Sequence, residues 1–90
     1  MLLPSQVQIG ESVIFQKLKD EAILLNMETQ HYFGLNGVAT RMWELMLESG
    51  ETGLVVEKIA EGYSADPETV RTDLTKLVAG LVDAGLLKAS

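Results

Sequence analysis

The sequence predicts an α+β domain in which a three-stranded antiparallel sheet is followed by three helices. Short runs rich in β-branched, aromatic and aliphatic residues, separated by polar turns, occupy residues 13–35. From about residue 37 onward, apolar residues recur three and four positions apart, which is typical of helices. The chain has 90 residues, 47% of them hydrophobic, which is enough for one core. One domain is therefore expected.

Three strands are expected, each bounded by a polar turn. They cover residues 13–18, 22–26 and 31–35. The run from Ile23 to Leu25 is apolar at successive positions, so it places apolar side chains on both faces of the second strand. Such a run predicts the middle strand of a sheet that is covered on both sides.

The third strand alternates between two faces. His31, Phe33 and Leu35 share one face, and Tyr32 and Gly34 share the other. A meander that ends in this way can leave its last strand as an open edge, with backbone N–H and C=O groups free to pair with another chain. The glycine marks either a close approach of another backbone, a bulge, or a kink before the helix.

Three helices are expected after the sheet. The first spans about residues 37–48 and is capped by Asn36, whose side chain can accept a hydrogen bond from a free helix N–H group. The second is shorter: it begins at Thr52 or Gly53 and continues to about Gly62. The third begins with Asp66 as its cap and Pro67 at its first position. Its apolar stripe consists of Val70, Leu74, Leu77, Val78, Leu81 and Val82.

The last two helices are joined by a short link, so they form a helix-turn-helix pair. With the small sheet beside this pair, the whole predicts a winged helix-turn-helix-like domain over residues 12–88. Residues 1–11, which Gly10 interrupts, are expected to be loosely ordered.

Composition excludes several classes of function. The net charge of −6, from 13 acidic and 7 basic residues, argues against binding to a phosphate backbone. No apolar run approaches the roughly 18 residues of a membrane span, and the start lacks the features of a signal peptide. The absence of cysteine excludes disulfides and thiol chemistry and fits a cytoplasmic protein. We therefore expect no nucleic acid and no membrane among the partners.

The residue pattern offers little catalytic chemistry. Histidine occurs once, at His31, and there is no cysteine, so no typical zinc site can form. Neighbouring Thr29 and Tyr32 make no recognisable nucleophile arrangement with it. The glycines form no phosphate-binding loop. We expect no enzyme activity, and neither catalytic residues, metal nor cofactor.

The sequence resembles the PqqD family of recognition elements for ribosomally synthesised, post-translationally modified peptides. These small domains bind the leader peptides of such precursors. The resemblance covers about residues 12–88. It rests on the runs Leu24 to Thr29, Tyr32 to Asn36, Met42 to Leu45 and Gly85 to Leu87, with Ala39, Ile59, Tyr63, Val70, Asp73, Leu74 and Leu77 between them.

The resemblance implies how the chain acts and which residues contact its partner. A leader peptide would add as an extra strand beside the third strand, and its side chains would enter a groove against the third helix. The strand residues are His31, Tyr32, Phe33, Gly34 and Leu35. The groove wall would come from Val70, Arg71, Leu74 and Val78.

Within the family, the motif Tyr32 to Asn36 after a Glu-Thr turn is more similar to the stand-alone leader-binding proteins of lasso-peptide synthesis. Such a protein delivers the leader to a separate cysteine leader peptidase, and a cyclase or other modifying enzyme acts with it. The alternative within the family is a peptide chaperone in pyrroloquinoline quinone synthesis.

Two alternatives lie outside the family. A winged helix could bind DNA, but on the third helix Arg71 and Lys76 are opposed by three carboxylates. Edge strands could also pair between two copies of the chain and form a homodimer.

Overall fold

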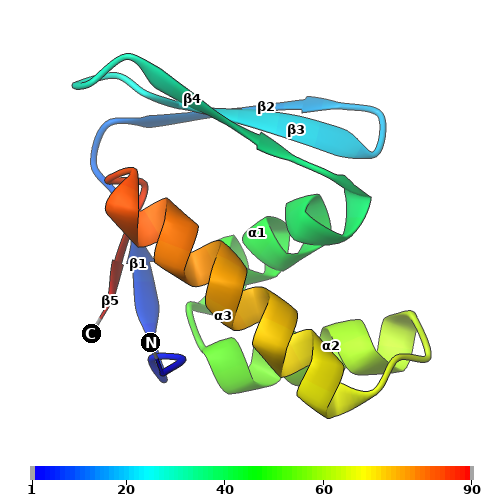
Figure 1. The fold of residues 1–90 in the computed structure, drawn as a ribbon. Coiled ribbons are helices and arrows are strands. Elements are labelled where there is room, and N and C mark those ends of the chain that lie inside the picture. The colour runs from blue at the N-terminus through cyan, green and yellow to red at the C-terminus, as the bar shows by residue number, and fades with distance from the viewer. Residues whose placement is uncertain (1, 90) are drawn as a thin grey trace.

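The computed structural model describes residues 2–89 and confirms the predicted sheet followed by three helices (Figure 1). The three-stranded antiparallel sheet has the order β2-β3-β4, and all three helices lie on one face of it. A second, two-stranded sheet pairs β1 with β5. The elements are β1 (Val7–Ile9), β2 (Val13–Leu18), β3 (Glu21–Asn26), β4 (His31–Leu35), α1 (Gly37–Ser49), α2 (Thr52–Gly62), α3 (Pro67–Asp83) and β5 (Leu87–Ala89).

The core lies between the helices and the inner face of the sheet, which is the face that packs on them. In the strand register, Phe15, Leu24 and Phe33 lie opposite one another across this face. Leu24 and Trp43 of α1 are fully buried, and the Trp43 ring lies 6.3 Å from that of Phe15, centre to centre, in a tilted arrangement. Aromatic pairs in such tilted geometry stabilise a core beyond the area that they bury.

The outer face of the sheet is not covered by the described residues, so the prediction of a middle strand buried on both sides is wrong. Ile23 in β3 is 40% exposed, whereas its neighbour Leu24 is fully buried. All of the helices follow the sheet in the chain and lie on its inner side, where α1 packs on the strands and α2 packs on α1 and α3 (Figure 1). The apolar character of the outer face is therefore not explained by the core.

The N-terminal segment is more ordered than the sequence predicted. Val7 is buried, and β1 pairs with β5 in antiparallel register, which places Val7 opposite Ala89. The Val7 N–H donates to the carbonyl of Gly50, at 2.9 Å. Gly50 has a left-handed backbone (φ +73°), and a Cβ there would lie 2.6 Å from the Val7 oxygen, so only glycine fits. These hydrogen bonds to distant parts of the chain keep β1 in place, although the sequence around it did not lead us to expect a strand.

The helix starts agree only partly with the predicted caps. The Asn36 side chain accepts a hydrogen bond from the Ala39 N–H at 2.9 Å, as expected for an N-cap. Asp66 occupies the N-cap position of α3, but its side chain makes no capping bond to the backbone. Its carboxylate instead accepts a bond from the Thr69 hydroxyl, at 3.3 Å. Pro67 begins the helix as predicted.

Asn26 connects the turn before β4 to the end of α3. Its side chain is buried, and the amide nitrogen donates to the Ala84 carbonyl at 2.8 Å. The amide oxygen accepts from the backbone N–H groups of Glu28 (3.0 Å) and Thr29 (3.4 Å). One side chain therefore fixes both the β3–β4 turn and its distance from α3.

Replacing this amide by a carboxylate tests that role. Asn26→Asp keeps the acceptor for the turn but removes the donor and places a buried oxygen against the Ala84 carbonyl. We expect a loss of about 1–3 kcal/mol in the free energy of unfolding, measured by urea denaturation. Gln16→Glu, the same chemical change at an exposed site in β2, should stay within about 0.5 kcal/mol of wild type. Equal midpoints for the two variants would contradict this role.

Candidate functional site

The free edge of β4 is the first part of the candidate site. β4 pairs with β3 on one side, and no strand within residues 2–89 pairs with its other side. The N-terminal segment does not pair with this edge, because β1 pairs with β5 in a separate sheet that lies below the strands (Figure 1). In an edge strand, alternate residues direct their N–H and C=O groups outward. An extended chain can pair with them there.

The residues of β4 are divided between the two faces as predicted. Leu35 is buried in the core, and Phe33 is half-buried against α3. His31, at the start of the strand, is exposed and its N–H donates to the Thr29 hydroxyl at 3.4 Å. On the outer face, Tyr32 is 73% exposed.

The Phe33 ring connects β4 to α3 at Gly80. Its atoms lie 3.3 and 3.4 Å from the position that a Cβ on Gly80 would occupy. The absence of a side chain at Gly80 thus lets the strand approach the helix closely. This contact identifies which side of α3 faces β4.

The helical repeat extends that side along α3. At about 100° per residue, positions three, four and seven apart lie on one side of a helix. Leu77, Lys76 and Asp73 therefore lie on the side of Gly80; Lys76 also borders the hollow described next, so we call Gly80, Leu77 and Asp73 the β4-facing side. Leu77 is half-buried and packs against the core, while Asp73 is exposed. An apolar side chain and a carboxylate thus lie along the helix next to the edge strand.

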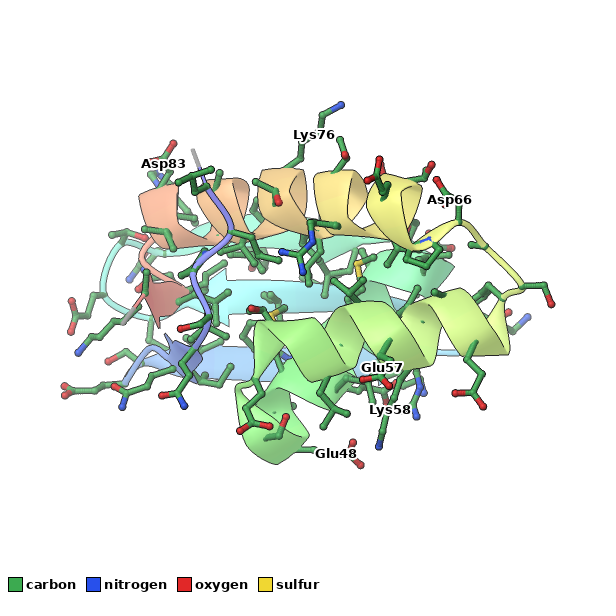
Figure 2. The ribbon with its side chains drawn as sticks, turned by 90° about the horizontal axis from the view of Figure 1, so that it is seen from below. Glu48, Glu57, Lys58, Asp66, Lys76 and Asp83 are labelled. Carbon is green, nitrogen blue, oxygen red and sulfur yellow. The ribbon has the colours of Figure 1, made fainter. Side chains whose placement is uncertain are left out.

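Arg71 lies on a different side of α3, so the structure does not bring it to β4. Together with Thr75 and Ala79 it lines a hollow of about 660 Å³ that Leu2 and Leu3 of the N-terminal segment also border. Lys76 lies at the rim of this hollow. Figure 2 shows Lys76 and Asp83 projecting together from α3, away from Glu57 and Lys58 of α2.

The other three residues predicted for the groove wall are in the core. Val70 is 4% exposed, and Leu74 and Val78 are 0% exposed. They have almost no surface that a peptide could touch in this structure, so they support the β4-facing side from beneath. The reason is their place at the centre of the apolar stripe, which the helix directs into the protein.

The outer face of the sheet forms a second surface that the sequence did not assign. Ile14, Leu25 and Tyr32 lie in one row across the three strands, and Gln16, Ile23 and Gly34 lie in the next. We call the apolar members the outer patch: Ile14, Leu18, Ile23, Leu25 and Tyr32. Four of them are 40–73% exposed. Contiguous apolar patches on a small domain usually mark an interaction surface.

Two sequence signals could have indicated the residues that were missed. Gly80 lies in the interior of a helix, where glycine is costly and often marks a close approach. The apolar residues on both faces of β3 could equally have predicted an exposed interaction face. Neither signal separates burial by the chain itself from burial by a partner.

The described residues contain no group of three or more acidic or histidine side chains that could hold a metal ion. Nor does any helix within residues 2–89 have the length and apolar character needed to cross a membrane.

In a winged-helix-like domain, an open strand edge can accept an extended chain as an added strand. Residues 21–87 match the family model described as coenzyme PQQ synthesis protein D (PqqD), which confirms the resemblance predicted from sequence. The chain belongs to the PqqD family. It is also similar to a solved structure titled "TbiB1 in Complex with the TbiA(beta) Leader Peptide", with 34% identity over 92% of this chain and 96% of that chain and a TM-score of 0.86. No curated protein matches the chain.

Proposed function

We propose that this chain recognises the leader peptide of a ribosomally synthesised, post-translationally modified precursor. The observation that supports this most directly is the free edge of β4, in a domain similar over nearly its whole length to TbiB1, whose structure contains a leader peptide. The chain acts as a non-enzymatic adaptor. We place it in the lasso-peptide branch, on the motif from Tyr32 to Asn36 and on this likeness.

The leader binds by adding a strand to β4. Main-chain hydrogen bonds give this mode its geometry, and side chains in alternate positions give it specificity. Each such bond contributes only about 0.5–1.5 kcal/mol net. Ordering a peptide that is disordered when free reduces the affinity further. Most of the binding energy must therefore come from a few apolar side chains of the leader.

The inward side chains of the leader strand lie along the β4-facing side of α3. There they meet Phe33 and Leu77, which are half-buried and so present apolar surface. Asp73 lies beside this surface and favours a basic or hydrogen-bond-donating leader group. Val70, Leu74 and Val78 do not touch the leader in this arrangement, because they are buried; they hold α3 in place beside β4.

Titration tests the proposed recognition directly. The probes are a synthetic leader from the precursor gene that neighbours this chain's gene and the TbiA(beta) leader named with TbiB1. Fluorescence polarisation should give saturable binding to at least one. A scrambled peptide of the same composition is the control. The proposal fails if neither leader binds at up to about 100 µM, a limit that corresponds to about −5.5 kcal/mol.

After capture, the chain delivers the leader to a separate cysteine leader peptidase, and a cyclase then acts on the remaining peptide. The outer patch is the surface that we assign to the peptidase. It is apolar, uncovered by the described residues, and on the face of the sheet opposite α3. Its β2 members, Ile14 and Leu18, lie at the sheet edge opposite β4, so a partner can dock on them without displacing a leader that is bound at β4.

A charge placed in the outer patch should weaken binding to the peptidase while leaving binding to the leader intact. Ile14 is 47% exposed and lies in β2, the strand farthest from the β4 edge. Ile14→Glu should weaken the complex with the peptidase at least about tenfold, roughly 1.4 kcal/mol, because a carboxylate loses its water in an apolar contact. Leader affinity should stay within about twofold. Both are measured with purified proteins, by pull-down and by polarisation.

The same experiment addresses self-association through this face. Light scattering of the wild-type chain and of Ile14→Glu reports whether two copies pair. A wild-type dimer that the substitution converts to a monomer would assign the outer patch to a homodimer instead of the peptidase.

A further inference from the structure

Gly34 is a glycine that the fold itself does not require. It lies within the unbroken register between β3 and β4, opposite Ile23, so there is no bulge. The positive-φ glycines of the described residues are Gly50 and Gly85, so Gly34 does not need a left-handed backbone. A Cβ built on it would meet no atom within 4 Å. Neither a kink nor close packing therefore explains it.

The cost of this glycine points to a role outside the unliganded fold. A glycine weakens a strand, because it loses more conformational freedom on folding and packs no side chain. By contrast, Gly10 and Gly50 have backbone oxygens within 2.8 Å of where a Cβ would lie. At those positions a side chain would clash, whereas at Gly34 it would only occupy open space.

The open space lies on the outer face, next to the free edge. Across the sheet, Gly34 is in the same row as Ile23, which is 40% exposed. Tyr32, two residues before it in β4, is 73% exposed on the same face. The glycine thus leaves a notch that Ile23 borders on one side and Tyr32 at one end, and that is open toward the strand edge.

We propose that this notch is a binding subsite for one large apolar side chain of the leader. The inference rests on the proposed strand addition. In a sheet, residues directly opposite each other on neighbouring strands point to the same face. The leader residue opposite Gly34 therefore projects onto the outer face. Strands lie about 4.8 Å apart, so this residue and Ile23 are separated by about 10 Å across the glycine. A long aromatic or aliphatic side chain spans that gap and contacts Ile23.

The subsite also fixes the register of the leader. A slip of one residue turns every side chain of the added strand to the other face. With a large residue held over Gly34, its neighbours in the leader are directed inward to Phe33 and α3. The outer and inner contacts are thus satisfied together in one register.

Filling the notch is the test, and it should move stability and binding in opposite directions. Gly34→Val places a β-branched side chain where a Cβ meets nothing, so the thermal midpoint should equal or exceed that of wild type. Affinity for the leader of the neighbouring precursor gene should fall about tenfold or more. Gly34→Ala should give a smaller loss. Gln16→Val is the matched control: it lies in the same row and on the same face, but in β2 at the other edge. It should change leader affinity less than about twofold.

A second set of peptides identifies the leader residue. Each large apolar residue of the leader is replaced by alanine in turn, and binding to wild type and to Gly34→Val is compared. One replacement should weaken binding to wild type strongly but add little loss in Gly34→Val, because the two changes remove the same contact. If Gly34→Val binds every peptide as wild type does, the subsite is refuted while leader recognition stands. If wild type binds no leader, both proposals fail.

Discussion

Leu74→Ala is expected to cost the domain about 2–5 kcal/mol of unfolding free energy, the range for a buried leucine truncated to alanine. The side chain is fully buried at the centre of the α3 stripe, where it contributes to the core between helices and sheet. In a domain of this size, each 1 kcal/mol lowers the melting temperature by about 4–8 °C. The midpoint should therefore fall by at least about 8 °C, as measured by circular dichroism.

The matched variant is Leu77→Ala, one turn further along the same helix. Leu77 is half-buried, so its truncation leaves a smaller cavity and should cost clearly less. Equal losses for the two leucines would contradict the burial difference between them. The more drastic Leu74→Asp would place a carboxylate in the core and is expected to unfold the chain. A loss of leader binding in that variant would report unfolding and not contact.

Leu77→Glu is expected to reduce leader affinity by about 30-fold or more, which corresponds to about 2 kcal/mol and to the loss of a binding hot spot. The carboxylate would stand on the β4-facing side of α3, where the proposed leader strand places apolar side chains. Fluorescence polarisation measures the affinity. A melting curve verifies that the variant is folded at the assay temperature, and Leu77→Ala provides a milder change at the same site.

Arg71→Gln tests whether the leader binds on the side of α3 that the sequence predicted or on the side that faces β4 in the structure. The sequence placed Arg71 in the groove wall, whereas the structure places it beside Leu3, in the hollow away from β4. Leader affinity should change by less than about twofold in Arg71→Gln. A large loss in Arg71→Gln, with none in Leu77→Glu, would move the binding surface to the other side of the helix.

The sequence predicted the fold where local patterns are strong. The alternation of residues 31–35, the cap at Asn36 and Pro67 at the start of α3 all rest on signals within a few residues, and the structure contains each of them. The pairing of β1 with β5 was not predictable in this way. It joins two three-residue strands from opposite ends of the chain, and no local pattern reports such a contact.

The candidate site was predictable at the strand and less so at the helix. β4 as an edge follows from a meander that ends in a helix. The side of α3 that faces this edge depends on the rotation of the helix about its axis, which the close contact between Phe33 and Gly80 fixes. A periodic stripe shows which residues are apolar, but it does not separate the buried centre at Leu74 from the accessible flank at Leu77.

The pairing of Val7 with Ala89 places the N-terminal and C-terminal strands side by side, in a sheet separate from that of β4 (Figure 1). A domain built in this way can be attached through either end, or inserted into a loop of a larger enzyme, with its binding edge unobstructed. The same closeness would permit a circularly permuted version, with the old ends joined by a short linker and new ones opened at the Lys19–Asp20 turn. Modular fusion to a processing enzyme is thus compatible with the architecture from either direction.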